Sequence, residues 1–300
     1  MKLARFNHDR LGLIEGERVF DVSAALKVLP AQRWPAPVGD PLIAHFADLL
    51  PVVQDARTSA RAVPLPEVTL HSPITQPSKI MAAPANYRKH VEQDTRDAGV
   101  DQGAHRKSLE GVERPSEKFG LFLKAQSSLA GPAEGIRTIL PDRRTDPEVE
   151  LAVVIGRTGR NIPCEQALRH VAAYTIGLDT TVRGAEDRSF RKSPDTYCTL
   201  GPWLVTADEI GDPHALTLTL SVNGEDRQRS STGAMTMKVG ELIALASSFY
   251  TLHPGDVLLT GTPEGVWPVW PGDTVHASCS GIGAMSLRVH PSLEGARSEN

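Results

Sequence analysis

The chain has 300 residues, of which 40% are hydrophobic and 23% charged, and its formal net charge is −4 at neutral pH. This ordinary globular composition, with neither a basic block nor an acidic tail, argues against a nucleic-acid partner, and the three scattered cysteines argue against a disulfide framework or a structural zinc site. No apolar run reaches the roughly 18 residues of a membrane span, so we expect a cytoplasmic protein with no membrane partner.

Residues 1–75 are predicted to form a small N-terminal α/β domain. Strand patterns followed by one helical pattern occur at 2–6, 11–14, 19–22 and 23–28. The sequence then becomes rich in proline. The segment 63–73 (VPLPEVTLHSP) indicates extended chain whose prolines deny it a central position in a sheet. We therefore place a domain boundary near residue 75.

Residues 91–118 differ in composition from the sequence on either side. They are highly polar, contain three glycines and show almost no apolar periodicity. A segment of this length without a core-facing stripe is typical of a mobile loop or lid beside a functional site. A disordered surface insertion is the alternative, and these residues do not decide between the two.

The rest of the chain, 76–300, is predicted to be a mainly β domain with some α structure. Apolar runs predict strands at 79–83, 119–124, 148–155 and 216–222. The last run meets Asn223-Gly224, which favours a tight hairpin. Helical spacing predicts helices at 164–174 and 239–252. Because strands and helices do not alternate regularly, a mixed or mainly antiparallel sheet is expected.

Three carboxylates stand out in this domain. Glu148 and Glu150 are two residues apart in a predicted strand, so both point to the same face. Asp179 ends the apolar run 171–178. If the three meet in a buried place they need a cation, and Mg²⁺ and Mn²⁺ both suit such oxygen ligands. The alternative is that the two glutamates lie on a solvated strand face.

Other polar residues could converge on the same place. Arg183 and Lys192 follow Asp179 and could hold a substrate carboxylate or an enolate, although an exposed basic loop is an equal alternative. The turn Gly261-Thr262 follows a short apolar run and could offer an N–H and a hydroxyl to an anion. His90, just before the polar segment, could act as a general base, or could simply be exposed.

The order of these segments resembles the fumarylacetoacetate hydrolase family over about residues 79–290. The fold that this resemblance implies is a mixed β-sandwich roll, usually dimeric, that follows a small N-terminal domain. The segments that carry the resemblance are NYRKH (86–90), FGLFLKAQSSLAGP (119–132), DPEVELAVVIGRTGRN (146–161), YTIGLD (174–179), SFRKSPDTYCTLGPWLVT (189–206), SVNGEDRQ (221–228) and YTLHPGDVLLTGTPEGV (250–266).

The resemblance also implies roles for single residues. The metal, Mg²⁺ or Mn²⁺, would be held by the three carboxylates already singled out. A small 2-oxo or dioxo acid would be the substrate and a second copy of the chain the partner. The implied assignments are Glu148, Glu150 and Asp179 to the metal, His90, Lys192 and Glu92 to catalysis, and Arg183, Thr262, Gly261 and Tyr87 to substrate binding.

At two positions the chain departs from the family pattern. Hydrolytic members carry His-x-x-Glu in the lid, but here Gln93 stands three residues after His90, and Glu92 could replace the missing acid only through a shift of one residue. Glu186 stands where many members that act on acylpyruvates have Gln. The implied activity is hydrolysis of a C–C bond in a 1,3-dioxo acid. Decarboxylation or keto–enol isomerisation, which needs no attacking water, and a non-catalytic metal-binding protein are the alternatives.

Overall fold

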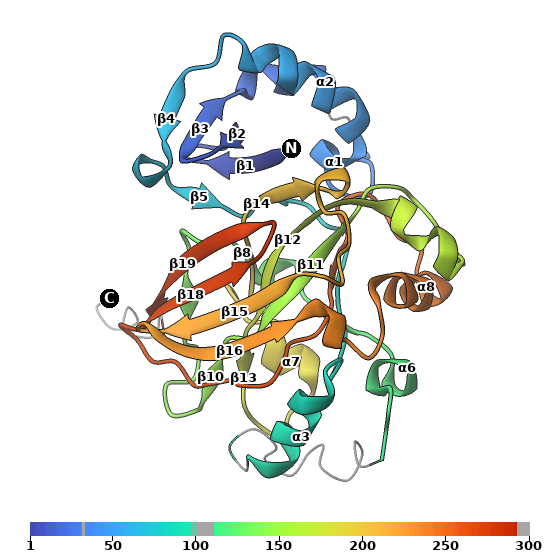
Figure 1. The fold of residues 1–300 in the computed structure, drawn as a ribbon, viewed down its shortest axis with the longest axis vertical. Helices are drawn as coiled ribbons and strands as arrows, with labels where there is room; N and C mark the ends of the chain where they lie inside the picture. The colour runs from blue at the N-terminus through green and yellow to red at the C-terminus, as the bar shows by residue number, and fades with distance from the viewer. Residues whose placement is uncertain (32–33, 98, 100–110, 293–300) are drawn as a thin grey trace.

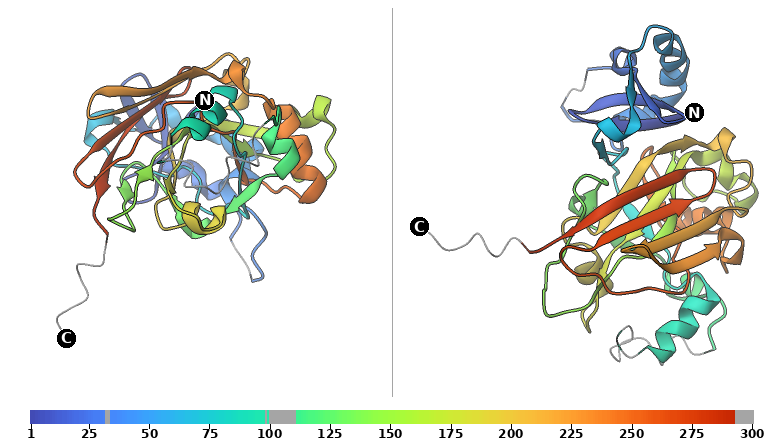
Figure 2. Two further views of the ribbon diagram at one scale, coloured as in Figure 1. Left: turned by 90° about the horizontal axis from the view of Figure 1, so that it is seen from below. Right: turned by 60° about the vertical axis from the view of Figure 1, so that its left-hand side comes forward.

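The computed structural model describes residues 1–31, 34–97, 99 and 111–292. Two sheets make up most of it (Figure 1). The N-terminal part lies at one end of the molecule and helix α3 (Arg88–Arg96) lies near the other, as the second view of Figure 2 also shows. The prediction of a mainly β fold that follows a small α/β N-terminal region is confirmed.

The larger sheet runs through both predicted domains. Its neighbours are antiparallel except for the pairs β17–β6 and β14–β8. Two short strands, β5 (Leu70–His71) and β8 (Leu129–Ala130), attach to β1 and β14. The main order across the sheet is β4 (Ala62–Pro64), β3 (Arg18–Asp21), β2 (Arg10–Glu15), β1 (Lys2–Phe6), β14 (Cys198–Thr206), β12 (Val171–Asp179), β11 (Val149–Ile155), β17 (Val257–Leu259), β6 (Ile80–Ala82) and β7 (Phe122–Lys124).

The smaller sheet packs one face against the core. Its strand order is β16 (Glu225–Ser231), β15 (Thr217–Val222), β18 (Thr274–Cys279), β19 (Gly283–His290) and β9 (Ile136–Arg137). Every second residue of β15 is buried, as expected for a half-buried strand. Asn223 and Gly224 both have positive φ, 53° and 84°, which a tight hairpin turn between right-twisted strands requires. The predicted hairpin is confirmed.

The N-terminal region forms its expected strands and a helix that the sequence analysis does not predict. Helix α2 (Phe46–Arg57) contains Pro51 and follows a proline-rich segment. These prolines obscure the helical spacing of its apolar residues. Strand β4 lies at the edge of the sheet, as the prolines of 63–73 require. The other helical pieces here are η1 (Ser23–Val28), α1 (Pro41–Ala44) and η2 (Leu65–Glu67).

Two predicted elements of the C-terminal region need correction. The helix expected over 164–174 ends early: η4 spans Cys164–His170, and β12 begins at Val171 because Ala173 and Tyr174 pair with β11 and β14. The strand expected over 119–124 is shorter, because α6 (Pro115–Phe119) precedes β7.

The helix expected over 239–252 is confirmed, although it ends at Phe249. The remaining elements are α8 (Val239–Phe249), α7 (Arg188–Lys192), β10 (Thr145–Asp146), β13 (Thr181–Val182), η3 (Gln126–Ser128), η5 (Ala207–Glu209) and η6 (Thr232–Ala234).

The predicted lid begins with regular structure rather than a loop. Helix α3 covers 88–96, and α6 lies at the far end of the segment. Residues 98 and 100–110 lie outside the described residues. In the parts of the chain that the structure describes, no helix is both long enough and apolar enough to span a bilayer.

Candidate metal centre

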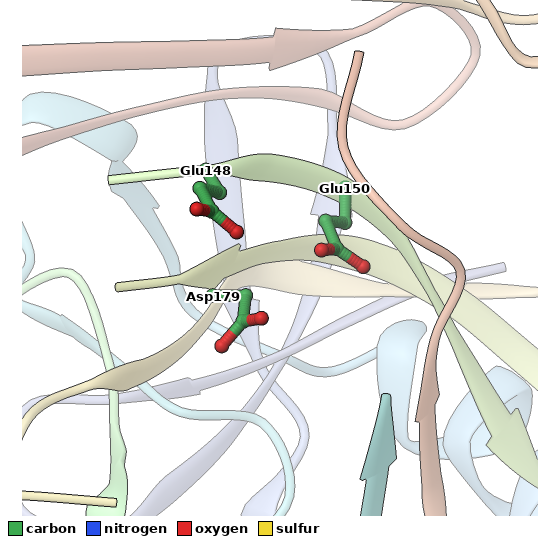
Figure 3. Close-up of side chains that lie close together, drawn as sticks. All are labelled: Glu148, Glu150 and Asp179. Atoms are coloured by element: carbon green, nitrogen blue, oxygen red, sulfur yellow. The ribbon is translucent and has the colours of Figure 1, made fainter. Parts of the chain in front are cut away.

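Three carboxylates meet where β11 and β12 run side by side. Glu148 precedes β11, Glu150 lies within it and Asp179 ends β12, where its N–H donates to the Glu148 carbonyl at 2.9 Å. Each residue offers one carboxylate oxygen within 4.8 Å of the others, and Figure 3 shows the three side chains gathered together. All three are at most 4% exposed. The same-face prediction is therefore confirmed, and the solvated strand face is wrong.

Two lysines lie among these carboxylates. Lys192 Nζ donates to Glu148 Oε2 at 2.8 Å and to Asp179 Oδ2 at 2.5 Å. Lys124 Nζ, from the edge strand β7, donates to the other oxygen of Asp179 at 2.5 Å. Both lysines are buried. Lys192 was expected at the site and is there, whereas Lys124 was missed, because one lysine in a short strand gives no sequence signal.

Arg183 lies behind the carboxylates. Its Nη2 donates to Glu148 Oε1 and its Nε to Asp146 Oδ2, both at 2.8 Å. Asp146 is fully buried and also accepts from Arg144. The alternative, that Arg183 and Lys192 lie in an exposed basic loop, is thus wrong, and Arg183 stabilises a metal-ligand candidate. Asp146 lies two residues before Glu148, and the pattern of the sequence alone does not show that it pairs with arginines rather than joining the two glutamates.

The two glutamates have opposite electrostatic environments. Burial alone would raise the pKa of Glu148, but the positive charges of Lys192 and Arg183 hold it well below its usual range. Burial, reinforced by the negative charge of Asp179, raises the pKa of Glu150 well above its usual range. Within the described part of the chain, Glu150 forms no ion pair. Its charge therefore lacks the compensation that the other two carboxylates have.

The turn after β17 holds Glu150 in place. The Gly261 N–H donates to Glu150 Oε2 at 2.5 Å, and the Thr262 hydroxyl donates to the Val149 carbonyl at 2.9 Å. Gln228 Nε2 donates to Thr262 Oγ1, while its oxygen accepts from the Val149 N–H. The anion that this turn binds is thus Glu150 itself. Gln228 was missed, because it reaches the site from the second sheet.

Gly261→Ala is expected to destabilise the protein by about 3 kcal/mol or more. Gly261 has φ +93°, and an added Cβ would lie 2.6 Å from Asn86 Cβ, so backbone strain and a clash combine. Gly272→Ala is the matched control, since φ is +99° but the space is open, and about 1 kcal/mol is expected. Urea unfolding of both variants measures the difference. Equal losses would show that Gly261 is needed only for its backbone angle.

Helix α3 places His90 and Gln93 on one side. Residues three apart on a helix are neighbours, whereas residues two apart point in nearly opposite directions. His90 is 6% exposed, and a positive charge on its ring would lower the pKa of Glu148, so it lies close to that carboxylate. Gln93 is partly buried and Glu92 is exposed. The helix has no shift in register that would turn Glu92 toward His90.

Gln93 joins α3 to the turn beyond Thr262. Its oxygen accepts from the Gly265 N–H at 2.6 Å, and its Nε2 donates to the Val266 carbonyl at 3.3 Å. A glutamate could accept the first of these hydrogen bonds but, when ionised, could not donate the second. In this structure the amide therefore serves as a two-point clamp.

Two further residues differ in their exposure to solvent: Tyr87 is buried and Glu186 lies on the surface. The Tyr87 hydroxyl is buried without a hydrogen-bond partner among the described residues, and its burial and the negative charge of Glu150 raise its pKa. Glu186 is exposed and forms a two-oxygen ion pair with Arg143 at 2.8 and 2.7 Å, which lowers its pKa to about 2. The negative charge of Glu186, which replaces the Gln of many family members, is thus already paired.

The chemistry of the donor set fits a hard divalent cation. Carboxylate oxygens suit Mg²⁺ and Mn²⁺, and the raised pKa of Glu150 is the response expected of a buried acid without a cation. The two lysines compensate the charges of Glu148 and Asp179, but neither forms an ion pair with Glu150, so the Glu150 carboxylate still lacks a compensating positive charge. The described residues therefore offer a complete set of three ligands whose electrostatics favour a bound cation.

Comparison with known proteins gives consistent similarities. Residues 79–290 match the family model described as fumarylacetoacetate (FAA) hydrolase C-terminal. A maleylpyruvate hydrolase from Aquipseudomonas alcaligenes is 50% identical over 289 residues, which cover 96% of this chain and 99% of that protein. The mitochondrial oxaloacetate tautomerase Fahd2a from Rattus norvegicus is 37% identical over 241 residues, covering 76% of this chain and 71% of that protein.

A solved structure supports the same fold. The crystal structure of maleylpyruvate hydrolase from Sphingobium sp. SYK-6, in complex with manganese (II) ion and pyruvate, is 35% identical. The alignment covers 97% of this chain and 100% of that one, with a TM-score of 0.79. The similarity therefore includes the N-terminal region as well as the two sheets.

Proposed function

Because the chain belongs to the fumarylacetoacetate hydrolase family, we propose that it hydrolyses maleylpyruvate, or a closely similar acylpyruvate, to pyruvate and a second acid. The predicted class, a metal-dependent hydrolase of C–C bonds in ketonic acids, is confirmed by its relatives. The observation that carries the proposal is the buried cluster of Glu148, Glu150 and Asp179 in a fold shared with a protein that binds manganese and pyruvate.

The metal would be Mn²⁺ or Mg²⁺, held by these three residues. When bound, it supplies a Lewis acid that polarises the oxygens of the 2-oxo acid portion of the substrate. Lys192, between Glu148 and Asp179, keeps the two ligands apart at fixed positions and adds a positive charge beside the substrate anion. The buried Tyr87 hydroxyl would donate to a substrate oxygen, which would satisfy it. Gly261 and Thr262 would act on the substrate indirectly, through the turn that holds Glu150.

His90 would activate water. Its ring accepts a proton from a water molecule as the water oxygen adds to the distal carbonyl carbon. The C–C bond then breaks, with its electron pair moving to the pyruvate side, and the proton on His90 returns to the methylene carbon to give pyruvate. Gln93 would hold α3, and with it His90, over the reacting atoms through its clamp on the turn. In this role neither a charged partner nor Glu92 is needed.

Keto–enol isomerisation is the second candidate, because the Rattus norvegicus relative is named an oxaloacetate tautomerase. The same cluster would serve it, but no water would be activated. Recognition of the small acid by Arg183, assembly into a homodimer and a cytoplasmic location also remain proposals. The ion pairs of Arg183 to Asp146 and Glu148 support an indirect role for that residue.

A substrate panel separates these functions. Purified protein with Mn²⁺ is expected to convert maleylpyruvate to pyruvate and maleate, and EDTA should abolish the reaction. Oxaloacetate tests both tautomerisation and decarboxylation, with the products identified by mass. Pyruvate formation that persists after EDTA and dialysis would contradict the metal requirement. Rapid oxaloacetate enolisation without hydrolysis of any acylpyruvate would favour the tautomerase.

A further inference from the structure

A chain of five alternating charges runs from helix α3 to a metal-ligand candidate. Its members in order are Asp97, Arg144, Asp146, Arg183 and Glu148. The distances between successive charged atoms are 3.1, 2.7, 2.8 and 2.8 Å. Asp97, 34% exposed, caps the C-terminal end of α3, and each later member is more buried than Asp97. This series of ion pairs therefore connects the surface end of α3 with the interior.

Arg144 is the member at which three parts of the molecule meet. Its Nη1 contacts Asp97 on α3, its Nε donates to both oxygens of Asp146, and its Nη2 donates to the Val266 carbonyl at 3.3 Å. Val266 also accepts from Gln93. A planar guanidinium can hold three partners in fixed directions, which a lysine cannot do.

Because Asp146 is buried, a change at one end of this series of ion pairs affects the other end. Asp146 has no exposed surface, so its charge depends on Arg144 on one side and Arg183 on the other. Arg183 in turn shares its charge between Asp146 and Glu148. If α3 leaves the turn and Arg144 moves with it, Asp146 loses one of its two ion pairs and its interaction with Arg183 becomes stronger. Because Arg183 also binds Glu148, the position of Glu148 changes.

We propose that Arg144 is a positioning residue that couples the docking of helix α3 to the geometry of the metal ligand Glu148. This inference rests on the proposed metal site. Docking of α3, which brings His90 to the site, then favours the arrangement of Glu148 that binds the cation. By reciprocity, a bound cation favours docked α3 to the same degree. The His90 side chain and the metal ligands would reach their working positions together.

The first test uses Asp97→Asn, which removes the outer charge of the chain without touching the site. Mn²⁺ binding by calorimetry should weaken about five- to tenfold, the lower part of the range for coupled sites. Lys89→Gln is the matched control. It removes another α3 contact, to Glu264 at 3.6 Å, that has no continuation to Glu148, and its Mn²⁺ affinity should equal that of the wild type.

A second measurement separates coupling from simple loosening of α3. In the wild type, Mn²⁺ should slow hydrogen exchange of the α3 amides, and in Asp97→Asn this slowing should be much smaller. The KM for the acylpyruvate should rise along with the change in Mn²⁺ affinity. Arg144→Lys should resemble Asp97→Asn, and the double variant should be no weaker than the worse single one, because both break the same link.

The outcomes distinguish this inference from the metal site itself. A wild-type protein that binds no Mn²⁺ would overturn both. Tight binding by the wild type with equal affinity in Asp97→Asn would overturn the coupling and leave the metal site standing. Faster α3 exchange in Asp97→Asn with unchanged Mn²⁺ affinity would assign to Asp97 only a structural role in that helix.

Discussion

Glu150→Gln is expected to abolish Mn²⁺ binding and hydrolysis while leaving the metal-free fold at least as stable as the wild type. The amide keeps an acceptor for the Gly261 N–H but loses the charge that a divalent cation needs. Changes to residues outside the ligand set cost metal sites about 10–100-fold in affinity, so loss of a ligand should exceed about 100-fold.

The expected stability follows from the sign of the Glu150 pKa shift. A raised pKa means that the folded protein binds the proton more tightly than the unfolded chain, so above the ordinary pKa of a glutamate the ionised group opposes folding. A neutral glutamine removes this opposition at neutral pH. A variant that had merely damaged the fold would show the reverse, a lower stability without metal.

Thermal unfolding with and without Mn²⁺ measures both effects of Glu150→Gln. Metal at about 100 times its Kd stabilises a protein that binds it by about 2.7 kcal/mol, and the variant should gain nothing. Glu165→Gln changes an exposed acid in the same way and is the control. Wild-type Mn²⁺ affinity in the Glu150 variant would refute the assigned ligand set.

His90→Gln is expected to lower kcat for acylpyruvate hydrolysis by about 10²–10⁴, the usual contribution of a general base. Glutamine has nearly the reach of histidine but cannot accept a proton from water near neutral pH. Because His90 is not one of the three carboxylates that form the metal cluster, Mn²⁺ affinity should change little. The loss should therefore appear in the chemical step.

Steady-state kinetics at saturating Mn²⁺, together with calorimetry, check this result for His90→Gln. Lys89→Gln, the neighbouring change on the exposed side of α3, should keep wild-type kcat. If His90→Gln hydrolyses at the normal rate, another group activates water. If instead its Mn²⁺ affinity collapses, His90 acts on the metal site rather than on water.

The sequence was most informative where one element carries the whole signal. Glu148 immediately precedes β11 and Glu150 lies within it, so their spacing alone predicts a shared face, and Asp179 ends a run too apolar to be on the surface. The Asn223-Gly224 turn is likewise local. In each case the neighbours along the chain determine the geometry, and no distant contact is needed to read it.

Residues that reach the site from other elements could not be found in this way. Lys124 lies in the edge strand and Gln228 in the second sheet, and only the packing of the sheets brings them to the carboxylates. The role of Arg144 could not be predicted for the same reason, because it depends on contacts with Asp97 and Asp146 that form only in the folded protein.

Helix α3 was misread for a different reason. It packs few apolar side chains, so it lacks the stripe on which helix prediction depends. Polar contacts hold it instead, through Gln93 and through Asp97. A helix held by hydrogen bonds and ion pairs looks like a loop in a hydrophobicity pattern.

The change in sequence character near residue 75 does not divide the sheet. Strand β1 pairs with β14 through Lys2↔Val205 and Leu3↔Leu204, and the other end of β14 pairs Cys198 with Asp179. A recombinant that exchanged the first 75 residues for those of a relative would have to preserve this register. A slip of one residue would turn Leu3 out of the core, and omission of β1 would leave the edge of β14 at Leu204 and Val205 unpaired and open to other chains. The two regions can therefore diverge in sequence, but they can be inherited or engineered separately only if the seam between β1 and β14 is kept.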